Sequence, residues 1–394
     1  MDKNKQIIYL DNNSTTPIDE RVLSAMMPYL TSNFANANST HLFGVGANNA
    51  VKESRRQVAE IIKAETNEII FTSGATEAIN IAIKGVAENY SKKGKHIITT
   101  TTEHKAVLDT CAYLESKGFE VTYLRVQSDG LVDLNDLKSA LRDDTILVTV
   151  LYVNNETGVI QPIKNMADLA HSVDAIFMTD ATQAVGKLEI DVEKDKIDLL
   201  AFSGHKIYGT KGVGALYVRQ RENRVKLSAL LHGGGHERGV RSGTLNVPGI
   251  VSLGKACELA NKEFEHNQNY IEELRNYLDR ELLKIPGTSI NGSIERRLYN
   301  VSNIQFEGVD SEAIIMGLSN PDGDNFPLIA VSNGSACTAA SIDPSHVLLA
   351  MGLNEIQAFN SIRFSLGKQN TIDELKIVIE AVTTVVSNLR EMSF

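Results

Sequence analysis

Residues 175–206 read AIFMTDATQAVGKLEIDVEKDKIDLLAFSGHK and contain two short apolar runs, each followed by polar side chains. Ala175–Thr179 and Leu199–Phe202 are typical of buried strands, and Asp180 and Lys206 come soon after them. Ligands of open parallel sheets bind at the carboxyl ends of the strands, so both residues are candidates for a site. A carboxylate there can hold a protonated pyridine nitrogen, and a desolvated lysine suits Schiff-base chemistry. In isolation, Asp180 would equally well cap the next helix, and Lys206 would be a surface residue after a turn.

Around this stretch, residues 50–220 alternate helical patterns with short β-branched runs. Such alternation indicates right-handed crossovers and a largely parallel sheet with helices on both faces, which is an α/β fold. The Gly-bounded run Val213–Val218 is short, and we expect it to be an antiparallel edge strand. The other strand candidates are Glu68–Phe71, His96–Thr101, Val121–Arg125 and Ile146–Tyr152, and the helical stretches are Ala75–Asn89, Lys105–Ser116, Leu134–Leu141 and Met166–Ser172.

After Gly249 the pattern changes to α+β. A long helical stretch, Ser252–Leu283, has the length of a connector between domains. Since one domain usually holds about 100–200 residues, we expect two: a large one from residues 13–262, and a smaller α+β one from residues 1–12 and 263–394. The smaller domain's candidates are the strands Leu298–Phe306, Leu328–Val331 and Ser361–Ser365, the helices Ser311–Leu318 and Thr371–Leu389, and the loop Asn320–Asn325.

The composition is typical of a globular protein, with 42% hydrophobic and 22% charged residues. A net charge of −10 argues against duplex nucleic acid as a tightly held partner, because neutralising phosphates requires a basic face. No window approaches ~18 consecutive apolar residues, and the N-terminus lacks a signal-peptide core. We therefore expect a cytoplasmic protein that is not bound to a membrane.

The chain has three cysteines, Cys111, Cys257 and Cys337. An odd number without CxxC spacing forms neither a disulfide framework nor a zinc site. Cys111 and Cys257 lie in helical patterns and are expected to be small buried hydrophobic residues. Cys337 lies in NGSACTAAS, among small and polar residues, and is set apart by that context.

A second candidate feature is the segment Phe71–Glu77, in which a strand passes through Ser-Gly-Ala-Thr into a helix. Backbone N–H groups at a helix N-terminus, together with hydroxyl groups, bind anions such as phosphate. An ordinary N-cap is the alternative.

Three further polar residues fit a site at the same sheet edge. His104 could stack on a planar cofactor and move protons, Asn155 could bind ligand oxygens, and Arg363 could grip a carboxylate bidentately. Taken singly, they could be a core histidine, a turn residue and an interdomain salt bridge. No metal is expected at His232 and His236, because the glycines between them disfavour a helix.

With these residues in view, the chain resembles the NifS/IscS-type cysteine desulfurases of the class V aminotransferase superfamily. The resemblance extends from YLDNNSTTP to the last helix. It rests on SGATEAINIAIKG, HIITTTTEHKAVLDT, VNNETGVIQP, DATQAVGKL, SGHKIYGTKGVGALYV, HGGGHERGVRSGTLNVP, GSACTAAS and SIRFSLG. It implies the fold type I of pyridoxal-phosphate-dependent transferases, with a mostly parallel seven-stranded sheet and a smaller α+β domain.

The resemblance also implies roles for individual residues. Lys206 would bind pyridoxal phosphate covalently, Asp180 would pair with the pyridine nitrogen, Gln183 with the ring hydroxyl, and His104 would stack on the ring. Cys337 would accept sulfur. The implied phosphate ligands are Ala75, Thr76, Ser203 and His205, joined by Thr244 from the partner subunit of a homodimer, and the implied ligands of the substrate carboxylate are Asn155 and Arg363.

The implied activity removes sulfur from L-cysteine, giving L-alanine and a persulfide on Cys337 that passes to a sulfur-acceptor protein. Iron–sulfur cluster assembly, tRNA thiolation and DNA phosphorothioation are the possible destinations. The alternatives are a selenocysteine lyase, another class V enzyme such as an aminotransferase, or a scaffold that kept only the fold. Relative to the family, residues 319–326 look expanded, which would lengthen the tether of Cys337. The sequence also ends soon after Leu389, and this puts an iron–sulfur scaffold as partner in doubt.

Overall fold

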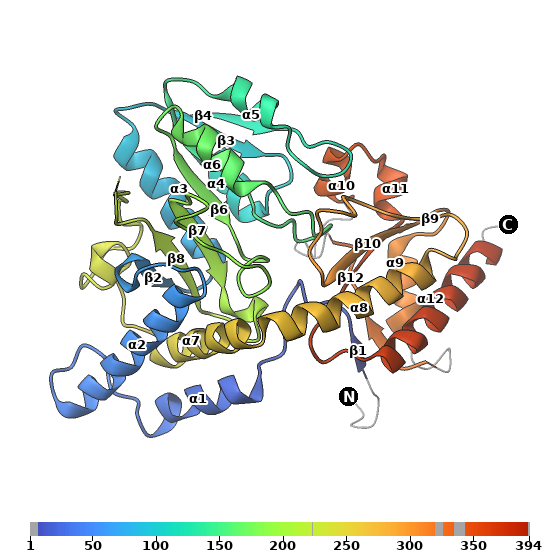
Figure 1. The fold of residues 1–394 in the computed structure, drawn as a ribbon, viewed down its shortest axis with the longest axis horizontal. Coiled ribbons are helices and arrows are strands. Elements are labelled where there is room, and N and C mark those ends of the chain that lie inside the picture. The colour runs from blue at the N-terminus through green and yellow to red at the C-terminus, as the bar shows by residue number, and fades with distance from the viewer. Residues whose placement is uncertain (1–6, 223, 320–325, 335–342, 393–394) are drawn as a thin grey trace.

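A computed structural model of the chain describes residues 7–222, 224–319, 326–334 and 343–392. It contains one large sheet flanked by helices and two small sheets at the other end of the molecule (Figure 1). Two features of the sequence, the loop Asn320–Asn325 and Cys337, lie outside the described residues.

The large sheet has seven strands in the order β2-β8-β7-β6-β5-β3-β4. The strands from β3 to β7 run parallel to one another, which confirms the mostly parallel seven-stranded sheet expected from the sequence. Its strands are β2 (Ile69–Thr72), β3 (His96–Thr100), β4 (Glu120–Leu124), β5 (Thr145–Thr149), β6 (Ile176–Asp180), β7 (Leu199–Ser203) and β8 (Gly214–Val218).

Strand β8 corrects one expectation. It is antiparallel to its neighbours, as expected, but it lies between β2 and β7 and not at the edge of the sheet. All five of its residues are buried, which suits a strand with neighbours on both sides and cover on both faces. The shortness of the run Val213–Val218 therefore does not predict an edge position in the sheet.

Alternate residues of the strands enter two hydrophobic clusters on opposite faces of the sheet. Ile69 and Phe71 belong to one cluster and Ile70 to the other. Helices α3 and α4 cover the face of Ile70, and α2, α6 and α7 cover the opposite face. The helices of this part are α1 (Glu20–Thr31), α2 (Leu42–Glu60), α3 (Ala75–Tyr90), α4 (Lys105–Glu115), α5 (Leu134–Ala140), α6 (Ile163–His171) and α7 (Val247–Lys262), with short 3-10 turns at Thr66–Glu68, Gly204–Lys206 and Glu237–Gly239.

The single long helix expected over Ser252–Leu283 is two helices. Helix α7 begins earlier, where the Asn246 side chain caps it and a proline occupies its first turn. It ends at Lys262, because the next residue, Glu263, has a ψ of 8° that departs from helical geometry, and α8 (Phe264–Leu282) follows at once. The pair runs along one side of the molecule from the large sheet to the small ones (Figure 1).

The two small sheets are β12-β10-β9, which is antiparallel, and β1-β11, which is parallel. Strand β12 matches the expected Ser361–Ser365, whereas β1, β9, α10 and α11 carried no clear pattern in the sequence. The elements are β1 (Ile7–Tyr9), β9 (Thr288–Ile290), β10 (Val301–Phe306), β11 (Leu328–Ala330), β12 (Ser361–Ser365), α9 (Ser311–Ser319), α10 (His346–Ala350), α11 (Glu355–Phe359) and α12 (Ile372–Met392).

Cys111 in α4 and Cys257 in α7 are fully buried, as expected, and burial raises the pKa of both thiols. Among the described residues, no helix combines the length and the apolar character that crossing a membrane requires.

Candidate active site

A cavity of about 620 Å³ opens at the carboxyl ends of the parallel strands. Ten residues that the sequence analysis singled out line it together. Thr244 is exposed and does not line this cavity, and Cys337 is outside the described residues. The ten are Ala75, Thr76, His104, Asn155, Asp180, Gln183, Ser203, His205, Lys206 and Arg363.

One end of the cavity is suited to a phosphate. Helix α3 begins there at Ala75, and the residue before it, Gly74, has no side chain to cap the helix. The amides of the first turn of this 16-residue helix therefore face the cavity at the positive end of the helix dipole. The Ser203 hydroxyl lies close by, 3.7 Å from the point where a Cβ on Gly74 would stand.

His205 contributes a neutral imidazole to the same end. Burial, followed by the nearby cations Lys206 and Lys211, lowers the pKa of His205 to about 4. Its Nδ1 lies 3.1 Å from the Thr15 hydroxyl oxygen. At neutral pH the ring can therefore donate one hydrogen bond to an anion but does not neutralise its charge.

The centre of the cavity carries the groups expected beside a pyridine ring. Asp180 ends β6, is 7% exposed, and accepts a hydrogen bond from the Thr182 amide at 2.9 Å. His104 caps α4 through its Nδ1, which accepts from the Ala106 amide at 3.1 Å. Because Nδ1 is an acceptor, the proton of the neutral His104 ring sits on Nε2.

Lys206 stands in the 3-10 turn directly after β7. Its Nζ donates to the backbone carbonyls of Asn13 at 2.6 Å and Ser14 at 2.7 Å. These carbonyls belong to the segment that links β1 to α1, so the N-terminal segment meets the turn after β7 at this amine. The sequence motif containing Asn13 and Ser14 had suggested membership of a family but no role for these two residues.

Arg363 comes to the cavity from β12 of the small sheet and is 3% exposed. Its guanidinium donates to the Asp11 carboxylate at 2.7 Å, the Ser14 hydroxyl at 2.7 Å and the Asn155 carbonyl at 3.1 Å. Its Nε is buried with no hydrogen-bond partner among the described residues. Three of its five N–H groups are thus used in holding the arginine in place, which leaves the Nε–H and one Nη1–H. Sequence reasoning missed Asp11, for which a lone acid after a short strand gives no signal.

The residues present fit pyridoxal phosphate. The uncapped first turn of α3 offers hydrogen-bond donors for a phosphate, Asp180 offers a carboxylate for a protonated ring nitrogen, and Lys206 offers an amine for a Schiff base. Thr182 Oγ1 is a further buried hydroxyl without a partner among the described residues. Within those residues, no group of three or more His, Cys, Asp or Glu side chains is placed to hold a metal ion.

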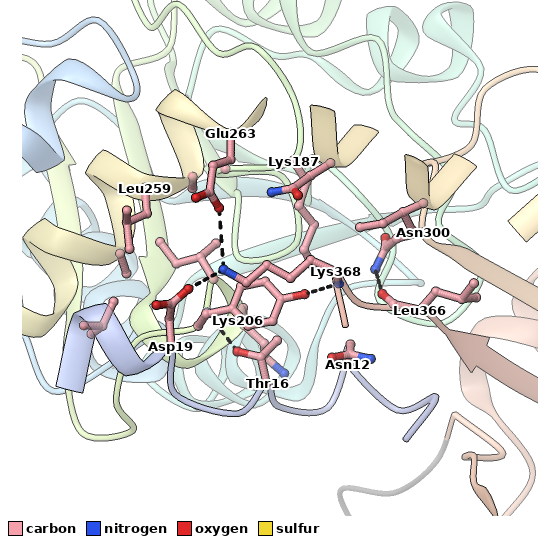
Figure 2. Close-up of a pocket in the computed structure, with 18 of the residues that line it drawn as sticks. Asn12, Thr16, Asp19, Lys187, Lys206, Leu259, Glu263, Asn300, Leu366 and Lys368 are labelled. Atoms are coloured by element: carbon pink, nitrogen blue, oxygen red, sulfur yellow. Dashed lines mark hydrogen bonds and ion pairs between the residues drawn. The ribbon is translucent and has the colours of Figure 1, made fainter. Parts of the chain in front are cut away.

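A second cavity, of about 40 Å³, lies behind Lys206 (Figure 2). Lys206 lines both cavities, whereas Gln183 lines only the large one and Lys187 only the small one. The small cavity has room for water but not for a substrate.

The family model of the class-V aminotransferases matches residues 8–378. The chain belongs to this family. Enzymes of the class-V aminotransferase family depend on pyridoxal phosphate, in agreement with the donor set of the large cavity.

Three similar proteins bear on which activity within the class-V aminotransferases this chain resembles. Cysteine desulfurase IscS of Pectobacterium carotovorum subsp. carotovorum is 51% identical over 98% of this chain and 94% of its own length. A solved structure described as a NifS-like protein is 38% identical and superposes with a TM-score of 0.90 over 97% of this chain and 100% of that one. Another, of SspA in complex with cysteine, is 40% identical, with a TM-score of 0.80 over 91% and 98% of the two chains.

Proposed function

We propose that this class-V aminotransferase is a cysteine desulfurase that converts L-cysteine to L-alanine and holds the sulfur as a persulfide on Cys337. The observation that carries the proposal is the convergence of Lys206, Asp180, His104 and Arg363 on one cavity. The names of the relatives supply the substrate class, since IscS is called a cysteine desulfurase and SspA was solved with cysteine.

Pyridoxal phosphate would be held at three points. The first turn of α3, with Thr76, Ser203 and His205, would bind the phosphate. Asp180 would pair with the ring nitrogen, Gln183 would donate to the ring oxygen, and Lys206 would form the covalent link. When bound, the cofactor supplies an electron sink for the bonds at Cα and Cβ of an amino acid.

Arg363 and Asn155 would bind the substrate carboxylate. The Arg363 guanidinium is already fixed by Asp11 and Ser14, so little side-chain entropy is lost when its remaining N–H groups meet a carboxylate. Fixing the carboxylate fixes Cα beside Lys206, whose Nζ would take the Cα proton. His104, whose ring carries its proton on Nε2, would return a proton in a later step of the reaction.

The sulfur transfer needs no external oxidant. The Cys337 thiolate would attack the substrate sulfur, so that an S–S bond forms and the Cβ–S bond breaks. The carbon keeps the electron pair and takes up a proton, giving alanine. A thiol and a cysteine thus become a persulfide and an alanine. The two sulfur atoms are oxidised, and Cβ is reduced by the same two electrons. Cys111 and Cys257 are unsuited to this role because they are buried and their pKa values are raised.

The enzyme would act as a homodimer. Exposed apolar side chains lie on α1, on the loop after it and at the start of α2, where Leu30 is 54%, Phe34 71% and Leu42 89% exposed. Exposed apolar patches of this kind mark interfaces. Thr244, exposed in the single chain, would reach the phosphate site of the second subunit.

The persulfide would pass to a sulfur-acceptor protein. The reaction requires free thiols, so we infer that it takes place in the cytoplasm, where reductants keep cysteine reduced.

The test is alanine and sulfide release from L-cysteine in the presence of a reductant, compared among wild type, Lys206→Ala and Cys337→Ser. Loss of both products in both variants, with a cofactor spectrum in Cys337→Ser that still responds to L-cysteine, supports the proposal. Normal alanine production by Cys337→Ser would instead indicate a different class V activity on the same cofactor.

A further inference from the structure

Lys187 is a buried amine to which the proposed reaction gives no role. It follows Gly186, whose φ of 75° lets the chain turn inward at a point where a side chain would press on Ala260 and Ile207. The residue is 8% exposed, and its Nζ donates to the Gln183 Oε1 at 2.8 Å. No ion pair between Lys187 and a carboxylate occurs among the described residues.

The surroundings make this burial costly. Lys206 and Arg363 are both near enough to oppose a positive charge on Lys187. Two carboxylates, Asp19 and Glu263, line the same small cavity, but both lie beside Lys368, at 2.5 and 3.6 Å (Figure 2). Burying an amine without a counter-ion destabilises a fold relative to an apolar side chain of similar size.

The contact nevertheless fixes the Gln183 amide. The ammonium form of lysine only donates hydrogen bonds, so the oxygen of the amide faces the protonated Lys187. A backbone carbonyl is only an acceptor, so the Gln183 Nε2 must face Asn13, to which it donates at 2.9 Å. The acceptor of Gln183 is therefore occupied, and what the side chain can still offer to the large cavity is its second N–H.

We propose that Lys187 is a positioning residue for the cofactor, which holds the Gln183 amide so that an N–H, and not the carbonyl, is offered to the ring oxygen of pyridoxal phosphate. This inference rests on the proposed function. It explains why a buried lysine stands between two cavities at Gln183, and it makes the Lys187–Gln183–Asn13 chain a support for the ring.

The electrostatics of Lys187 agree with this role. Burial, and then the charges of Lys206 and Arg363, lowers the pKa of Lys187 to about 7. The amine therefore remains a hydrogen-bond donor in either protonation state. Perturbed amines of this kind concentrate at functional sites.

The test measures the dissociation constant of pyridoxal phosphate from the protein stripped of cofactor, and the pH midpoint of the visible absorption of the bound cofactor. The variants are Lys187→Met, Gln183→Leu, their double variant, and Lys187→Gln, which retains a neutral donor. Lys92→Met, at an exposed lysine, is the matched control. A thermal melt of each stripped protein checks that it is folded.

Lys187→Met should weaken cofactor binding about 2- to 10-fold, the usual effect of one lost hydrogen bond. It should also raise the pH midpoint by about half a unit, because a donor stabilises the anionic ring oxygen. In the Gln183→Leu background the same substitution should change binding less than about 2-fold, since the two residues act as one unit. Lys187→Gln should bind more tightly than Lys187→Met.

Equal losses from Lys187→Met in the two backgrounds, or no loss in either, would overturn the inference. If Lys187→Met does not fold, an unchanged affinity and pH midpoint in Gln183→Leu would overturn it as well. Failure of the proposed function looks different, because the wild type itself would then bind no pyridoxal phosphate or release no alanine from L-cysteine.

Discussion

Glu103 shows at the scale of one residue how burial sets the chemistry near the site. It precedes His104 and is 0% exposed; its Oε1 accepts from the Leu151 amide and the Thr100 hydroxyl, both at 2.8 Å. Its Oε2 has no hydrogen-bond partner among the described residues. Burial raises the pKa of Glu103 to about 8, against the opposing effect of those two hydrogen bonds. The side chain is therefore a neutral acid over most of the physiological range.

A raised carboxyl pKa means that the folded protein binds this proton more tightly than the unfolded chain. Stability from Glu103 is thus present at low pH and is lost as the pH rises toward about 8. In Glu103→Gln the fall in unfolding free energy between pH 5 and pH 8 should shrink by on the order of 3 kcal/mol. Denaturant titrations at both pH values measure this, with exposed Glu295→Gln as control. Equal slopes for wild type and Glu103→Gln would contradict it.

Arg363 carries a prediction about substrate binding. Its planar fork engages Asp11, Ser14 and the Asn155 carbonyl at once, a geometry that a lysine ammonium does not reproduce. Arg363→Lys should raise the KM for L-cysteine about 10-fold or more, while pyridoxal phosphate stays bound. Steady-state kinetics and the cofactor spectrum test this together. An unchanged KM would remove Arg363 from the substrate site.

The sequence predicted those cavity residues that lie in a recognisable motif, and it missed those that do not. Asp180, His104 and Lys206 each follow a strand, so the parallel sheet brings them to one edge. Asp11 and Lys187 could not be found in this way. Asp11 has its role through a contact with the distant Arg363, and Lys187 through its burial and its hydrogen bond to Gln183, which no motif in the sequence shows.

At the scale of elements, residues 335–342, which include Cys337, are flanked in sequence by two described stems, one ending at Gly334 and the other containing Ser345. Both stems approach the Glu156 carboxylate. Ser345, which caps α10, donates to Glu156 Oε2 at 2.5 Å and accepts from the Leu348 amide at 3.2 Å. On the other stem, Gly334 has a φ of 86°, and a Cβ there would lie 2.6 Å from the same carboxylate oxygen. Glu156 adjoins Asn155, so the stems and the proposed substrate site share one support.

Ser345→Ala should cost about 1–3 kcal/mol of stability, because it removes a helix cap and leaves a buried carboxylate oxygen without its donor. Chemical denaturation measures the loss, and Ser387→Ala, at an exposed position of α12, is the matched control with no expected change. Equal stability of the two variants would show that the Glu156 contact contributes nothing.

Elements with strong periodic patterns were predicted well and short ones were not. The strands of the large sheet were found within a few residues, because buried parallel strands read as continuous apolar runs. Strands β1 and β9 have three residues each, and α10 and α11 five, too few for a pattern to emerge. The break at Glu263 was missed because its surroundings remain helical on both sides.

On the whole molecule, several exposed large apolar side chains belong to α1, the loop after it and the beginning of α2, elements that lie away from the small sheets (Figure 1). If this surface joins two subunits, Phe34→Asp with Leu42→Asp should convert a dimer into monomers, because buried charges without partners oppose association. Light scattering would show the change, and cofactor affinity should fall as Thr244 is lost from the site. Met316→Asp, at a residue that is 72% exposed on α9, should leave the dimer intact. A wild-type monomer would contradict this account.

The division of the chain at residue 262 into two domains stays a prediction. The α/β class and the seven-stranded sheet are confirmed, since both follow from regular alternation along the chain. Arg363, expected from the sequence at this site, lies in β12 of the small sheet and lines the cavity with Lys206, but no pattern in the sequence predicts the contact between these two parts of the chain. That contact depends on packing between segments far apart in sequence.

The most direct test of the central claim is the intact mass of the protein after reaction with one equivalent of L-cysteine without reductant. We predict a gain of one sulfur atom, located on Cys337 by peptide mapping, with an equal amount of L-alanine released and no gain in Cys337→Ser. Added sulfur on Cys111 or Cys257, or full alanine release without any mass gain, would contradict the account.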